Sequence, residues 1–301
     1  MVCFRDLTSK GYVLVRSFLS EEELLALRND FGSLKSDSHH AGEIMMVSLD
    51  MQLRLEDKLR AICAGVHADT GIHGDRRAEA GYFATSTGFS YPWHQDHVSF
   101  FIFQQHFDYL NFYIPIFKPH LETSNLSIIP FDALTAIAPN EASRFVGGGA
   151  CRFFPMAEEA TTRVIDDEAG SVFTLPANLD ALAVTPMLAA GDLLLLRGDM
   201  IHKTQEGATD RVAVSFRRVG TERILTKARL HQGGPIKLAM IAASRALYGP
   251  IQHCFARMRK DEVSTGEYLA FAESLMSKSF AVPHYVPSPS AHQAASERIV
   301  G

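Results

Sequence analysis

The stretch GDLLLLRGDMIHKTQEGATDRVAVSF, residues 191–216, holds the signals that decide the fold of this chain. Its apolar run at 192–197 and the alternating run at 211–219 are typical of β-strands, and the Gly-Asp pair at 198–199 is typical of a turn. His202 follows that turn, so we expect it to begin a further strand. The segment therefore predicts short strands joined by turns.

The same signals extend over about 79–219, where period two and short apolar runs dominate. Turns rich in Gly and Pro separate the runs, which favours a mainly β fold with flanking helices, a sandwich or double-sheet jelly roll, over a parallel α/β sheet. Residues 131–170 look irregular, as lid loops often do. The expected strands are 80–86, 98–104, 109–117, 125–130, 171–176, 182–187, 192–197 and 211–219.

Helical periodicity flanks the β region on both sides. Ser20 and Glu23 form a capping box, in which each residue satisfies a free backbone N–H at a helix start. We expect one domain over 1–301, with a β core at about 79–219, N-terminal helices at about 20–70 and C-terminal helices at about 235–280. The expected helices are 21–31, 51–68, 235–248 and 266–279.

Composition excludes several classes of protein. The chain has 301 residues, of which 47% are hydrophobic and 21% are charged, as in ordinary globular proteins. Its net charge of -5 argues against a nucleic-acid partner. The four cysteines form no C-x-x-C pair, which argues against a disulfide scaffold. The charged N-terminus and short apolar runs predict no membrane segment and a cytoplasmic location. The oligomeric state stays open.

The tripeptide His94-Gln95-Asp96 offers an imidazole and a carboxylate on alternate residues. In an extended segment such residues share a face, so both can reach one ion. A facial triad needs one more histidine, and His202 is the natural partner because it begins a strand. The H-x-D pattern also occurs at 67/69, 73/75 and 106/108, but only the 94/96 pair lies in an aromatic strand-turn-strand context.

Arg211 begins the strand that follows His202. A strand there places Arg211, Ala213 and Ser215 on one face. A guanidinium inside a barrel is costly unless it is paired, and an organic dicarboxylate would pair with it. Arg217 lies on the same alternating face and is the rival anchor. The order of H-x-D, His and Arg therefore predicts a metal with an organic acid bound beside it.

These motifs resemble the phytanoyl-CoA dioxygenase-like branch of the Fe(II)/2-oxoglutarate-dependent oxygenases over about residues 10–219. The segments 11–20, 110–115 and 126–130 carry the resemblance too, although Phe131-Asp132-Ala133 stands where the family often has Gly-Ser-His. The resemblance implies a double-stranded β-helix, or cupin-like jelly roll, with helices outside. It implies iron held by His94, Asp96 and His202, 2-oxoglutarate bound by Arg211, and further co-substrate contacts from Asn111 and Thr204.

The implied reaction is hydroxylation of a C–H bond in a small molecule. The co-substrates are 2-oxoglutarate and O₂, and the products include succinate and CO₂. Asp96 favours hydroxylation, because halogenases of this class leave that ligand position open. One alternative is a cupin-like metalloenzyme without 2-oxoglutarate, although most cupin sites use an H-x-H pair and a Glu. Another is a catalytically silent barrel that acts as a binding protein.

Three further patterns have simpler explanations. His97 is more readily a polar strand-edge residue than a substrate contact. The aromatic run from Phe100 to Phe117 is more typical of barrel core than of an apolar substrate pocket. The basic cluster from Arg217 to Arg229 is more typical of a solvated face than of an anion site.

Overall fold

The main sheet is antiparallel throughout and has six strands in the order β1-β9-β4-β11-β3-β2. The computed structural model describes residues 3–34, 44–85, 90–156, 159–205 and 210–276. The strands of this sheet are β1 (Tyr12–Val15), β2 (Ile44–Met46), β3 (Arg76–Thr85), β4 (Tyr109–Phe117), β9 (Leu193–Arg197) and β11 (Arg211–Val219).

A second layer is assembled around His94. His94 forms two isolated antiparallel bridges, one with His202 on one side and one with Arg152 on the other. These bridges join a two-stranded sheet and a three-stranded sheet into one continuous layer. The strands of this layer are β5 (Leu126–Ile128), β6 (Cys151–Met156), β7 (Thr161–Asp166), β8 (Ser171–Leu175) and β10 (His202–Thr204).

The two layers pack face to face over an apolar cluster. Tyr113, Leu194 and Ala213 come from the main sheet, and Leu126 and Ile128 come from β5 of the second layer. All five are buried, as the inner faces of two packed sheets should be. The prediction of a mainly β fold with flanking helices is confirmed.

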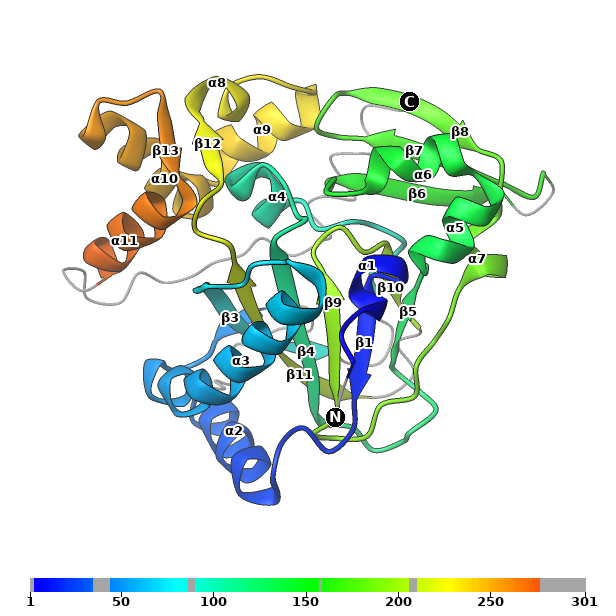
Figure 1. The fold of residues 1–301 in the computed structure, drawn as a ribbon, viewed down its shortest axis with the longest axis vertical. Helices are drawn as coiled ribbons and strands as arrows, with labels where there is room; N and C mark the ends of the chain where they lie inside the picture. Colours follow the sequence, from blue (N-terminus) through cyan, green and yellow to red (C-terminus); the bar gives the residue numbers. More distant parts are fainter. Residues whose placement is uncertain (1–2, 35–43, 86–89, 157–158, 206–209, 277–301) are drawn as a thin grey trace.

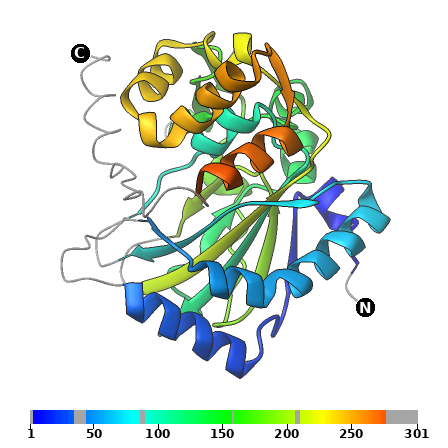
Figure 2. The ribbon, with the colours of Figure 1, turned by 90° about the vertical axis from the view of Figure 1, so that its left-hand side faces the viewer.

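Helices α2 (Glu21–Leu34) and α3 (Leu49–Thr70) cover the outer face of the main sheet (Figures 1 and 2). Phe216 of β11 joins their apolar side chains in one cluster. The predicted capping box is present, because the Ser20 N–H donates to the Glu23 carboxylate at 2.7 Å and the Glu23 N–H donates to the Ser20 hydroxyl at 3.2 Å.

The remaining helices lie around the second layer and the top of the main sheet (Figure 1). Phe145 of α6 packs on Phe153 and Val164, on the outer face of the second layer. A two-stranded antiparallel sheet, whose strands are far apart in the sequence, and the C-terminal helices pack around α4. These elements are α1 (Asp6–Ser9), α4 (Val98–Phe103), α5 (Phe131–Ile137), α6 (Pro139–Phe145), α7 (Leu179–Leu182), β12 (Ile224–Thr226), α8 (Lys227–Leu230), α9 (Pro235–Ala243), α10 (Arg245–Met258), β13 (Glu262–Ser264) and α11 (Thr265–Met276).

Three predictions about secondary structure are wrong. The apolar run 98–104 forms helix α4 instead of a strand, because burial on all sides gives it no polar face that would reveal its period. Residues 182–187 contribute one isolated bridge, between Val184 and Ile128, rather than a strand. The segment 131–170 is not irregular, since it contains α5, α6, β6 and β7.

Two predicted helices differ from the structure in their bounds. The predicted helix 235–248 is divided at Ser244 into α9 and the start of α10. The predicted helix 266–279 corresponds to α11, and its last three residues lie outside the described residues. Within the described ranges, none of the helices combines the length and the hydropathy that a bilayer span requires.

Candidate metal centre

Backbone hydrogen bonds set the distance between the two predicted histidine ligands. The His94 N–H donates to the His202 carbonyl at 3.0 Å, and the His202 N–H donates to the His94 carbonyl at 3.0 Å. Directly opposed residues in an antiparallel pair point to the same face, so both imidazoles face the main sheet. Their ring centroids lie 4.3 Å apart.

The same backbone also sets the tautomer of each ring. His94 Nδ1 lies 2.7 Å from the Pro92 carbonyl, and His202 Nδ1 lies 3.0 Å from the Met200 carbonyl. A carbonyl can only accept, so each Nδ1 carries a proton, and in the neutral form of such a ring Nε2 is the nitrogen with the free lone pair. Burial, and then the neighbouring His202, lower the pKa of His94 to about 3, so His94 is neutral at physiological pH.

Asp96 completes a three-donor set. Its Oδ1 lies 3.9 Å from His94 Nε2 and 3.8 Å from His202 Nε2. One ligand atom from each of the three residues lies within 4.8 Å of the others. Two imidazoles and one carboxylate on a common face are the donors of a facial non-haem iron site. The residues present therefore fit iron, and both histidines have the hydrogen-bonded Nδ1 that metal ligands usually show.

Arg211 lies on the inner face of β11 and is 3% exposed. One terminal nitrogen donates to the Ser124 carbonyl at 2.6 Å, and the guanidinium carbon lies 5.8 Å from the centre of the Tyr113 ring. Its Nε is buried without a hydrogen-bond partner among the described residues, and none of the ion pairs found there includes it. A buried cation in this state is costly, so the site favours an added anion.

Arg217, the rival anchor, has a different environment. It pairs with the Glu79 carboxylate and lies 3.7 Å from Asp96 Oδ2. Burial lowers the pKa of Arg217 to about 10, so it stays charged at neutral pH. Because two carboxylates already balance its charge, Arg217 has less need of a further acid than Arg211.

The structure places Asn111 and Thr204 inside the fold, with protein partners. The Asn111 side-chain oxygen accepts a hydrogen bond from the Ser215 hydroxyl at 2.5 Å. The Thr204 hydroxyl accepts a hydrogen bond from the Tyr91 N–H at 2.8 Å. Both residues are buried, and both help to fix the strands that carry the centre.

Tyr91 is a neighbour of the centre that sequence reasoning did not select. Its ring centroid lies 5.9 Å from that of His94. Burial raises the pKa of Tyr91 to about 12, and the charge of Asp96 adds to this shift while that of Arg211 opposes it. Tyr91 therefore lies near both Asp96 and Arg211. Its place three residues before His94 was the only signal in the sequence.

His97 points away from the three donors. Its Nε2 lies 2.9 Å from the Asp167 carboxylate, and its Nδ1 lies 2.9 Å from the Gln95 carbonyl. Arg152 makes two further bonds to the same carboxylate. Burial alone would raise the pKa of Asp167, but hydrogen bonds from His97 and Arg152 lower it overall. His97 therefore has a scaffolding role.

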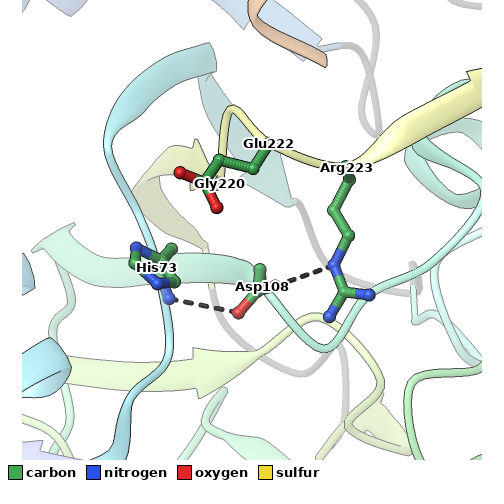
Figure 3. Close-up of a pocket in the computed structure, with 5 residues that line it drawn as sticks. All are labelled: His73, Asp108, Gly220, Glu222 and Arg223. Atoms are coloured by element: carbon green, nitrogen blue, oxygen red, sulfur yellow. Dashed lines mark hydrogen bonds and ion pairs between the residues drawn. The ribbon is translucent and has the colours of Figure 1, made fainter. Parts of the chain in front are cut away.

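The other H-x-D pairs have other partners. Figure 3 shows a hollow between His73, Asp108 and Arg223, in which Asp108 accepts bonds from the His73 N–H at 3.1 Å and from Arg223 Nε at 2.9 Å. His106 is buried against the Ser99 hydroxyl. In the part of the chain that the structure describes, only residues 94, 96 and 202 form a group with metal-ligand geometry.

Comparisons with known proteins bear on the fold. No family model matches the chain, and no curated protein does. SnoN, an alpha ketoglutarate dependent epimerase from nogalamycin biosynthesis, matches with a TM-score of 0.50 and 14% identity over 73% of this chain and 82% of SnoN. The carbocyclase SnoK of the same biosynthesis matches with a TM-score of 0.49 and 14% identity over 73% and 83% of the two chains.

HygX from Streptomyces hygroscopicus, with nickel and 2-oxoglutarate bound, has a TM-score of 0.48 and 15% identity over 76% of this chain and 93% of HygX. The likeness to SnoN concerns the fold, and it does not distinguish the phytanoyl-CoA dioxygenase-like branch. The two packed β layers and this likeness show that the chain has the jelly-roll fold of the non-haem, 2-oxoglutarate-dependent enzymes.

Proposed function

We propose that this chain is an Fe(II)- and 2-oxoglutarate-dependent oxygenase of the phytanoyl-CoA dioxygenase-like type. It hydroxylates a C–H bond of a small molecule and releases succinate and CO₂. One observation carries the proposal: the donors of His94, Asp96 and His202 lie within 4.8 Å of one another, and Arg211, buried in the same interior, has no ion-pair partner among the described residues. The shared fold with SnoN supports it.

Each residue of the centre has a distinct task. His94, Asp96 and His202 hold the ion, and Arg211 binds the distal carboxylate of 2-oxoglutarate through its planar fork. Bound Fe(II) supplies O₂ activation that is coupled to oxidative decarboxylation of 2-oxoglutarate. Asn111 and Thr204 position these groups through the strands that carry them.

Apolar side chains line the interior around the proposed metal site. Tyr113, Leu194, Leu196 and Ala213 are buried on the inner face of the main sheet, facing Ile128 of the second layer. They keep bulk water away from the co-substrate, so the attraction between Arg211 and a carboxylate is stronger than it would be in water. This dry lining is what an oxygenase requires to direct oxidation at its substrate.

A small organic molecule is the proposed substrate. SnoN has a structure with Fe³⁺, alpha ketoglutarate and nogalamycin RO, at a TM-score of 0.50 to this chain. Asp96 occupies the position where a halide would bind, which supports hydroxylation over halogenation. Since SnoN is an epimerase and SnoK a carbocyclase, product analysis decides between hydroxylation and these outcomes.

The test is anaerobic titration of the purified protein with Fe(II) and 2-oxoglutarate. We expect a visible metal-to-ligand charge-transfer band, and succinate once O₂ is admitted. The His202→Ala variant should show neither. Iron binding that is indifferent to 2-oxoglutarate and to Arg211→Ala would favour the cupin-like alternative. A protein that takes up no metal would favour the silent binding protein.

A further inference from the structure

Arg217 connects the two layers of the fold at the candidate metal centre. It belongs to the inner face of β11 in the main sheet, whereas Asp96 follows His94 in the second layer. One terminal nitrogen of Arg217 lies 3.7 Å from Asp96 Oδ2, and the other pairs with the Glu79 carboxylate. The Arg217 side chain is 15% exposed and that of Asp96 is 17% exposed. The contact is thus an ion pair between layers, partly shielded from water.

The two oxygens of Asp96 face different neighbours. Oδ1 lies 3.9 Å and 3.8 Å from the Nε2 atoms of His94 and His202, on the side where the ion binds. Oδ2 faces Arg217. This division matters because a carboxylate can bind a metal through one oxygen or through two. A guanidinium beside Oδ2 competes with the ion for that oxygen.

The sheet holds Arg217 in this place. Glu79 of β3 lies directly opposite Arg217, and the register of β11 against β3 shifts between Arg217 and Arg218. Such irregularities often redirect a side chain next to an active site. Arg218, the next residue, points to the outer face and pairs with Glu56 of α3. Arg217 is therefore held by its cross-strand neighbour on one side and by Asp96 on the other.

We propose that Arg217 is a positioning residue that makes Asp96 bind the ion through only one of its two carboxylate oxygens. The inference rests on the proposed function. Three single-atom ligands leave three of the six positions of an octahedral ion open. Chelating 2-oxoglutarate would take two of them and leave the third for O₂. If Asp96 bound through both oxygens, 2-oxoglutarate would fill the last two positions and none would remain for O₂.

The test compares Co(II) spectra and 2-oxoglutarate kinetics of the wild type with those of Arg217→Gln, Arg217→Lys and Glu79→Gln. Co(II) is added alone, without 2-oxoglutarate, because its visible spectrum reports the type and geometry of its ligand atoms. We expect Arg217→Gln to change that spectrum. We also expect turnover to fall roughly 10–100-fold, as for other partners of metal ligands, while the Kd for 2-oxoglutarate changes less than about threefold.

The other variants separate positioning from general damage. Arg217→Lys keeps the charge and should restore part of the turnover. Glu79→Gln should shift the spectrum in the same direction, and to a smaller extent. Arg16→Gln is the matched control, because Arg16 pairs with Asp192 at 2.7 Å in another ion pair between chain segments. It should leave the Co(II) spectrum unchanged.

Two results would overturn the inference, and they differ in what they imply. An unchanged Co(II) spectrum in Arg217→Gln, with 2-oxoglutarate binding weakened tenfold or more, would make Arg217 a co-substrate ligand and leave the proposed function intact. A wild-type protein that binds no Co(II) would overturn the proposed function together with this inference.

Discussion

The two faces of strand β11 separate stability from chemistry. On the outer face, Val214 and Phe216 lie in an apolar cluster, and Arg218 pairs with Glu56 of α3. On the inner face, alternate residues include Arg211 and Ser215, which are buried, and Arg217, which is partly buried. Burying apolar area stabilises a fold, whereas burying charge without a partner costs free energy. One strand therefore contributes most of its stability through one face, and its other face carries side chains of the proposed acid and metal site.

The largest expected effect comes from removing a proposed metal ligand that faces the inner side of β11. His202→Ala should weaken metal binding by more than the ~100-fold that is typical of indirect partners, because a ligand itself is lost. Calorimetric titration with Co(II) measures this. His97→Ala is the control, since His97 bonds to Asp167 instead. Equal loss in both variants would show that the centre is not at His202.

A cavity on the outer face should lower the stability of the fold and leave metal binding unchanged. Phe216 is 2% exposed, and Phe216→Ala should lower the free energy of unfolding by about 3–5 kcal/mol. The folded fraction should keep its metal affinity, because no metal donor moves. Urea unfolding together with Co(II) titration provides both values. A variant of normal stability that loses the metal would contradict the separation of the two faces.

Lowering the pH tests the difference between the two faces without a substitution. The titratable members of the outer cluster, Cys63 and Tyr82, have pKa values that burial raises, so they take up no proton in acid. His106 near the centre is also buried, and its pKa is lowered to about 4, chiefly by burial. The unfolded chain, with a histidine pKa near 6.5, binds more protons between these values. Stability should thus be fully present above pH ~6.5 and fall toward pH 4, by on the order of 3 kcal/mol from His106.

Urea unfolding at several pH values measures that loss. The His106→Gln variant should show a flatter dependence on pH between about 4 and 6.5, because glutamine does not titrate. A variant with the same slope as the wild type would assign the acid sensitivity to other groups.

The smallest expected effect concerns the inner face alone. Arg211→Ala removes a charged hydrogen-bonding partner worth about 1.5–3 kcal/mol, so the Kd for 2-oxoglutarate should rise about 10–150-fold. Co(II) affinity without 2-oxoglutarate should be unchanged. Equilibrium titration of the Co(II)-loaded protein with 2-oxoglutarate checks this. Weaker binding in Arg217→Ala but not in Arg211→Ala would exchange the roles of the two arginines.

Sequence reasoning succeeded where the pattern is local and ordered. Alternation placed His94 and Asp96 on one face, and a turn before His202 predicted the strand that reaches it. The structure brings these three side chains together. The capping box at Ser20 was equally readable, because both partners are three residues apart.

Other features depend on tertiary contacts that no local pattern contains. Helix α4 was mistaken for a strand because Phe100 to Phe103 are all buried and show no period. Hairpin β6–β7 was missed although its strands pair over six residues, since mixed polar and apolar side chains hid its alternation. Arg211 and Arg217 share one face, and only their partners, a carbonyl against two carboxylates, distinguish them.

The reciprocal hydrogen bonds between His94 and His202 have a consequence for folding. A strand slipped by one residue turns every side chain to the opposite face. In a mispaired chain the two imidazoles would then no longer face a common ion. Iron would bind the correctly paired chain in preference, and by mass action it would stabilise that pairing over its slipped competitors. Bound iron would thus favour the correct strand register while the chain folds, before any catalysis begins.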